Sequence, residues 1–125
     1  MSEMFEVADN VDVLKLPVAE SLILKSREMP WQHSDAPGFW VKPLVEDECQ
    51  GIRTWLMKVD AGAFSEMHGH RQYEQIYVLE GSFYDQDNVY GPGDFIVRAP
   101  GALHTAGSEE GALVLLFYSS KANAG

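Results

Sequence analysis

Short apolar stretches separated by turn residues dominate the chain from residue 39 onward. These stretches are rich in β-branched and aromatic residues and follow one another closely, which is typical of strands. We expect strands at residues 39–45, 52–59, 75–79, 82–84, 89–90, 94–98 and 112–118. Residues 85–88 read Asp-Gln-Asp-Asn and are expected to form a hairpin tip, because Asp and Asn tolerate tight turns. The pattern predicts an all-β fold, a single antiparallel barrel or jelly roll.

The first 38 residues lack this regularity. No window of a dozen residues keeps the spacing of an amphipathic helix, and residues 18–25 are compatible with a short helix or with a strand. Leu22, Ile23 and Leu24 would make an apolar edge strand for pairing with a partner subunit, which favours a homodimer. We therefore divide the chain into an N-terminal arm and edge segment (1–38), a barrel (39–120) and a small, polar tail (121–125).

Composition and charge narrow the class of protein. The chain has 125 residues, 46% of them hydrophobic, which suits one domain with its own core. Its formal net charge of -10 argues against nucleic acids and anionic membranes as partners, because both are bound mainly through basic side chains. The acidic N-terminus does not resemble a secretory signal, and the lone Cys49 cannot form an intrachain disulfide. We therefore expect a cytoplasmic protein.

Four histidines are the residues most suggestive of chemistry: His33, His68, His70 and His104. His33 follows Trp31 in a loop-like stretch, and a surface role is expected for it. In a strand, residues two apart share a face, so His68 and His70 would both point into the interior. Glu74 follows four residues later. Three imidazoles and one carboxylate suit Mn, Fe, Ni, Cu or Zn better than Ca or Mg.

These residues carry two motifs with glycines at fixed spacing. The first is Gly62-(five residues)-His68-x-His70-(three residues)-Glu74-(six residues)-Gly81, and the second is Gly93-(five residues)-Ala99-Pro100-Gly101-x-x-His104. Together they resemble the two motifs of the RmlC-like cupin superfamily. Two positions depart from the family pattern: the proline stands at 100 instead of 99, and Ser108 replaces an asparagine. The resemblance implies metal ligation by His68, His70, Glu74 and His104.

Residues 40–44, 99–104 and 108–111 narrow the resemblance to the ChrR-type cupins. That group includes zinc-binding domains of anti-sigma factors. It also resembles small iron dioxygenases that act on acetylacetone or dihydroxyacetophenone. Cupins of this size are commonly dimers, so the resemblance implies a homodimer as well.

Two classes of function remain open. An octahedral iron with four protein ligands keeps two open positions, which suits a dioxygenase acting on a small enolisable or diketone-like compound, with Glu74 as a possible base. A zinc held tetrahedrally by all four ligands would be closed, which suits a non-catalytic sensor or regulatory module. We favour the iron enzyme because 125 residues leave no room for a helical sigma-binding domain. Mn²⁺, Ni²⁺ or Zn²⁺ and a metal-dependent isomerase or decarboxylase remain alternatives.

Neighbouring residues are expected to support the site or the fold. The glycines are expected to form turns and corners. Glu66 and Arg71 flank the ligands and are weaker candidates for contact with them. Cys49 lies in an acidic turn with no cation to lower its pKa, so we do not expect a nucleophile there.

Overall fold

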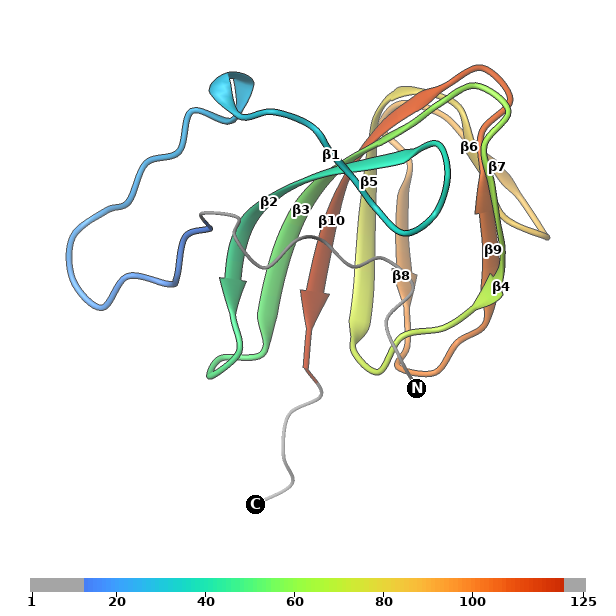
Figure 1. Ribbon diagram of the computed structural model, residues 1–125. Coiled ribbons are helices and arrows are strands. Elements are labelled where there is room, and N and C mark those ends of the chain that lie inside the picture. Colours follow the sequence, from blue (N-terminus) through green and yellow to red (C-terminus); the bar gives the residue numbers. More distant parts are fainter. Residues whose placement is uncertain (1–12, 121–125) are drawn as a thin grey trace.

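The chain folds into two antiparallel β-sheets, described by a computed structural model for residues 13–120. The larger sheet has the strand order β1-β2-β3-β10-β5-β8, and the smaller has the order β4-β9-β6-β7. The strands are β1 (Gln32–His33), β2 (Phe39–Asp47), β3 (Ile52–Val59), β4 (Phe64–His68), β5 (Tyr73–Gly81), β6 (Phe83–Tyr84), β7 (Val89–Tyr90), β8 (Phe95–Arg98), β9 (His104–Gly107) and β10 (Ala112–Ser119). Figure 1 shows the larger sheet as one curved surface, with the smaller sheet folded against it. This is the all-β jelly roll that the sequence predicts.

The core follows the two-residue period of the strands. In β3 the side chains of Trp55, Met57 and Val59 are buried, and the residues between them are less so. In β10 the same alternation buries Val114, Leu116 and Tyr118. Burying a large apolar side chain contributes about 1.5–3 kcal/mol, so this alternation fixes which face of each strand turns inward.

Strand β10 completes the larger sheet from the far end of the chain. It lies between β3 and β5, and Tyr118 is paired with Arg53 on one side and with Glu74 on the other. On the next strand, Arg98 of β8 is paired with Glu74. Glu74 of β5 therefore lies between Tyr118 of β10 and Arg98 of β8, which are distant from each other in the sequence.

The turn between β5 and β6 shows why glycine is required at a corner. Gly81 has a φ of +77°, and a Cβ there would collide with the backbone of Gly111. The predicted hairpin tip is also present, because the Asp85 carboxylate accepts hydrogen bonds from the N–H groups of Asp87 and Asn88, each at 2.8 Å.

The strands predicted from residue 39 onward are all present, with ends that differ by no more than two residues, whereas β1, β4 and β9 were not predicted. The edge strand expected at Leu22–Leu24 is wrong: this segment forms neither strand nor helix, and Leu22 and Ile23 are exposed. The arm is instead attached by the short strand β1 and by a bridge from Leu14 to Val45. The helix left open for residues 18–25 is limited to the 3₁₀ turn η1 (Ser26–Glu28). Within residues 13–120, no helix has the length and apolar character to cross a membrane.

Candidate metal centre

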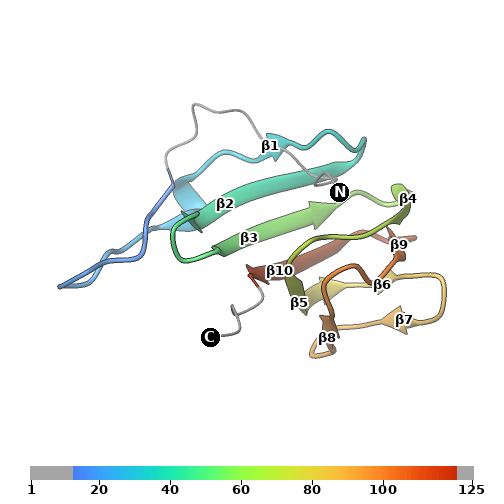
Figure 2. The same ribbon diagram turned by 90° about the horizontal axis from the view of Figure 1, so that it is seen from below.

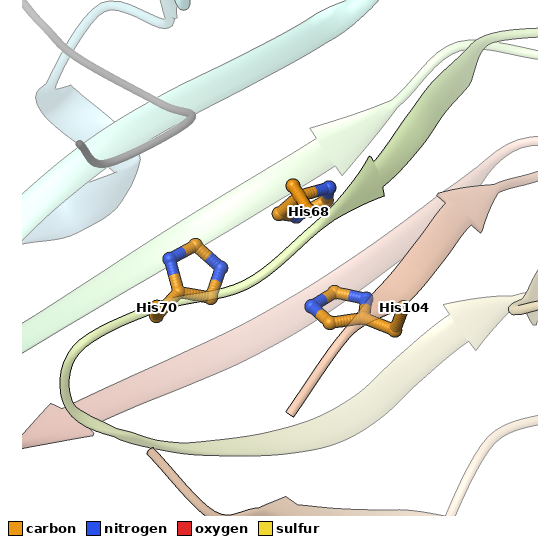
Figure 3. A group of neighbouring side chains, drawn as sticks. All are labelled: His68, His70 and His104. Carbon is orange, nitrogen blue, oxygen red and sulfur yellow. The ribbon is translucent and has the colours of Figure 1, made fainter. Parts of the chain in front are cut away.

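Three buried histidines meet between the two sheets. His68 ends β4, His70 follows two residues later, and His104 begins β9. One ring nitrogen of each lies within 4.8 Å of those of the other two, and all three side chains are buried. Figure 3 shows the three rings gathered around a common space. A cluster of this kind could hold a divalent metal ion.

Cross-strand pairing places two of the three rings. His68 is paired directly with His104 in the β4–β9 ladder, and their ring centroids are 4.4 Å apart. The pair follows a register shift in the ladder after Ser65. Irregularities of this kind are common beside functional sites, where they bend a strand and change the direction of its side chains.

His70 reaches the site by a route that the sequence did not predict. Strand β4 ends at His68, so His70 does not share its face through strand alternation. Its carbonyl instead accepts a hydrogen bond from the N–H of Gly101 at 2.7 Å, which ties the loop after β4 to the loop before β9. Gly69 permits this close approach, because a Cβ there would lie 3.0 Å from the carbonyl oxygen of Ala102 and 3.2 Å from the Leu103 side chain.

Backbone carbonyls fix the tautomers of two rings. The Nδ1–H of His68 donates to the Glu66 carbonyl at 2.8 Å, and the Nδ1–H of His104 donates to the Thr105 carbonyl at 2.9 Å. A neutral imidazole carries one hydrogen, so both Nε2 atoms present lone pairs. Burial lowers the pKa of His68, which favours this neutral form although the Glu66 carbonyl acts in the opposite direction.

Glu74 lies beside the histidines on β5. Its carboxylate oxygens are 3.3 Å from Nε2 of His70 and 3.4 Å from Nε2 of His104, and its side chain is 4% exposed. Burial raises the pKa of this carboxyl, whereas a proton on Nε2 of His104 or His70 would donate to it and hold the pKa well below its usual range. An ionised Glu74 at this buried place therefore requires a cation, a proton or a metal ion, between its oxygens and those Nε2 atoms.

Sequence reasoning missed two further charged residues at the site, Arg98 and Asp85. The Nε of Arg98 lies 3.4 Å from a carboxylate oxygen of Glu74, and its Nη2 donates to the Asp85 carboxylate at 3.0 Å. A signal was present in the sequence: Arg98 lies two residues after Ile96 on a short strand, so it shares the inward face of that buried residue. An inward-facing arginine requires an acidic partner.

The remaining candidates have other roles. Glu66 contributes its backbone carbonyl, whereas Arg71 and Cys49 are exposed, and His33 packs on Trp40 away from the cluster. Ser108, which departs from the family pattern, is fully buried. It donates to the carbonyl of Ser82 and accepts from the N–H of Gly111, so it supports a turn.

Known structures share this architecture. KdgF from a Halomonas species is 26% identical, with a TM-score of 0.68 over 84% of this chain and 97% of that chain. The anti-sigma protein ChrR of Rhodobacter sphaeroides, solved in complex with SigE, is 23% identical with a TM-score of 0.62, over 75% of this chain and 50% of that chain. A predicted oxalate decarboxylase from Thermotoga maritima is 20% identical with a TM-score of 0.69, over 80% of this chain and all of that chain.

None of the curated proteins matches the sequence. The family model of the ChrR cupin-like domain, however, matches residues 19–122, which include all four of the candidate ligands and both sheets. This match covers most of the chain, so the narrower of the two resemblances seen in the sequence is confirmed. The chain therefore belongs to the family of ChrR cupin-like domains.

Proposed function

We propose that this protein binds one divalent metal ion through His68, His70, His104 and Glu74, and that it is a mononuclear iron dioxygenase. The substrate would be a small enolisable or diketone-like compound that chelates through two oxygens. The observation that carries the proposal is the convergence of three buried imidazoles in one cluster, with the Glu74 carboxylate beside two of them. Iron(II) is the favoured metal, with Zn²⁺, Mn²⁺ and Ni²⁺ as alternatives.

The chemistry of the donors supports a metal at this place. The Nε2 of His104 turns a lone pair toward Glu74, and that carboxylate oxygen is also electron-rich. Two such atoms 3.4 Å apart in a buried site repel each other unless a proton or a metal cation lies between them. A divalent ion meets this requirement and accepts both as ligands.

Iron bound here would supply Lewis-acid and oxygen chemistry, with two positions of an octahedron left open. The protein residues supply the surroundings. A dication with one carboxylate and neutral imidazoles carries a formal charge of about +1, which favours an anionic ligand such as an enolate. The Glu74 carboxylate could accept the proton that an enolisable substrate loses, provided that it is released from the metal.

A non-catalytic zinc module is the second candidate. The family match and the likeness to ChrR favour it, since that protein was solved in complex with a sigma factor. The binding partner of the chain would then be another protein instead of a small-molecule substrate. Zinc held tetrahedrally by all four residues would leave no position for a substrate. A metal-dependent isomerase or decarboxylase is the third candidate, and the likeness to the Thermotoga protein favours it.

Oxygen consumption separates these candidates. The protein is loaded anaerobically with iron(II) and tested in an oxygen electrode with β-diketones, hydroxyacetophenones and related enols. Oxygen uptake with one of these compounds, absent in the His104→Ala variant, is the expected result. No uptake with any of them, together with four-coordinate zinc in the isolated protein, would support the sensor module instead. Conversion of a substrate without oxygen uptake would support the third candidate.

We also propose that the protein is a cytoplasmic homodimer that pairs through the outer face of the larger sheet. Tyr77, Phe95 and Val97 point outward there and are 44%, 52% and 61% exposed. Tyr77 and Phe95 are paired across β5 and β8, with their rings in edge-to-face contact. Contiguous exposed apolar side chains of this size mark interaction surfaces. Cys49 is exposed as a free thiol, which suits a reducing compartment.

A further inference from the structure

The hairpin tip between β6 and β7 contacts residues next to two of the candidate ligands, Glu74 and His104. Figure 2 shows this hairpin beside β8, at the edge of the molecule opposite β1 and β2. Asp85, at the start of the tip, reaches Arg98 on β8. The next residue, Gln86, accepts a hydrogen bond from the N–H of Thr105 at 2.9 Å and donates one to the carbonyl of Leu103 at 3.4 Å. These two backbone groups lie on either side of His104.

Asp85 is held rigidly enough to anchor another side chain. One carboxylate oxygen accepts from the N–H groups of Asp87 and Asn88, and the other accepts from the Tyr90 hydroxyl at 2.6 Å and from Arg98. Burial raises the pKa of Asp85, but the hydrogen bonds from Tyr90, Asp87 and Arg98 outweigh burial and lower the pKa to about 2. Asp85 is thus a fixed negative charge, with its position set by its own turn.

Arg98 connects the fixed Asp85 carboxylate to Glu74. Its guanidinium is anchored through Nη2 on Asp85, and its Nε lies 3.4 Å from Oε1 of Glu74. The same oxygen lies 3.4 Å from Nε2 of His104, and the other oxygen, Oε2, lies 3.3 Å from Nε2 of His70. A free glutamate side chain has several rotatable bonds, and immobilising it costs entropy. A guanidinium held on one oxygen removes part of that cost before a metal binds.

We propose that Arg98, anchored by Asp85, is a positioning residue that holds the Glu74 carboxylate in the orientation in which its two oxygens face Nε2 of His104 and Nε2 of His70, where the metal would bind. This proposal rests on the metal site of the proposed function. The Arg98 guanidinium is already paired with carboxylates of the protein, since its Nη2 donates to Asp85 and its Nε lies 3.4 Å from Glu74. Asp85 also balances the charge of Arg98, so the guanidinium does not leave a net positive charge that would repel a dication.

A double-mutant cycle tests this role, with cobalt(II) as the probe metal. The chelator-treated full chain is titrated with cobalt(II) in competition with a chromophoric chelator, and the visible absorption of bound cobalt reports its coordination. Glu74→Gln is expected to weaken cobalt binding by about tenfold or more in the wild-type background. In an Arg98→Met background the same change is expected to cost less than about threefold, because Glu74 is no longer oriented.

Gln86→Ala is the matched control. It loosens the same hairpin next to His104 but leaves Asp85 and Arg98 in place, so Glu74→Gln should still cost about tenfold in that background. The cobalt spectrum of Arg98→Met should match that of Glu74→Gln. If Arg98→Met fails to fold, Arg98→Lys is used: it keeps the charge but lacks the Nε–H and the planar fork, and should also reduce the cost of Glu74→Gln.

Two results would overturn the proposal in different ways. Equal losses for Glu74→Gln in the wild-type and Arg98 backgrounds would show that Arg98 acts only on the fold, while the metal site itself would stand. A wild-type chain that takes up no cobalt would overturn the metal site of the proposed function, and the positioning role with it.

Discussion

Tyr118 packs edge-on against His70, with ring centroids 5.1 Å apart and ring planes at 61°. Tyr118 lies on β10 and is 1% exposed, and on its other side the Arg53 guanidinium lies 4.4 Å from the ring centre. Strand β10 thus packs against His70, which lies in the loop between β4 and β5. Because His70 lies in a loop, this packing is part of what holds its ring in the cluster.

Replacing Tyr118 by alanine is expected to lower the free energy of unfolding by about 3–5 kcal/mol, the usual cost of removing a buried aromatic ring. Urea denaturation of the metal-free protein measures this loss. Tyr118→Phe keeps the ring against His70 and should retain metal binding. Val89→Ala, at a position 77% exposed, serves as the control and should change stability by about 0.5 kcal/mol or less. A Tyr118→Ala protein as stable as Val89→Ala would contradict the packing role.

Removing any one candidate ligand should strongly reduce the metal content of the protein. We expect His68→Ala, His70→Ala, Glu74→Gln and His104→Ala to purify with less metal than the wild type, as measured by elemental analysis. His33→Ala is the control, because His33 packs on Trp40 outside the cluster. Full occupancy in the His104→Ala protein would show that the second motif does not supply a ligand.

Chelation should lower the melting temperature of the wild type but leave that of His104→Ala unchanged. A metal that binds only the folded state stabilises it by about 2.7 kcal/mol at a free concentration one hundred times its dissociation constant. Differential scanning calorimetry with and without a chelator measures the effect. Identical melting temperatures for the wild type in the two conditions would count against a bound metal that stabilises the folded state.

Asp85 should make the stability of the protein depend on pH in a defined window. Its pKa is about 2 in the folded protein, below the ordinary value of 3.8. The folded state therefore holds this proton less tightly, so the stabilisation is fully present above about pH 4 and is lost as the pH falls through 2. In chelator-containing buffer, the difference in urea midpoint between the wild type and Asp85→Asn should be largest near pH 6 and shrink as the pH is lowered.

A difference between these two proteins that stays constant from pH 6 to pH 3 would refute this linkage. It would mean that Asp85→Asn changes stability through the shape of the hairpin tip and not through the charge. Asp87→Asn is a suitable comparison, because Asp87 is exposed and takes part in the tip through its backbone N–H.

A charge on the outer face of the larger sheet should dissociate the proposed homodimer. Phe95→Asp places a carboxylate beside Tyr77 in that face, and a dimer would have to bury it without a partner. Analytical ultracentrifugation at micromolar concentration should show a dimer for the wild type and a monomer for this variant. Leu22→Asp, on the exposed arm, should leave the dimer intact. A monomeric wild type would refute the proposal.

Features that depend on neighbouring residues could be predicted from the sequence. Apolar runs rich in β-branched and aromatic residues, bounded by turn residues, identified β3 and β10. Residues 85–88 were recognisable as a hairpin tip because Asp85 satisfies the turn within its own segment. The two spaced motifs identified the family and the three histidines that the structure brings together. Ligation by Glu74 stays a prediction.

Tertiary structure decided which distant residues meet. Pairing of β10 between β3 and β5 and of β4 with β9 joins segments far apart in the chain, and such pairing depends on packing that no local pattern encodes. His70 is held by the loop contact of Gly101 and by Tyr118, not by the strand alternation expected for it. Arg98 contacts Glu74 on its own sheet and Asp85 at the hairpin of the other sheet, so both sheets must be packed together before these contacts form. An inward-facing charge is stable only where the fold supplies such partners.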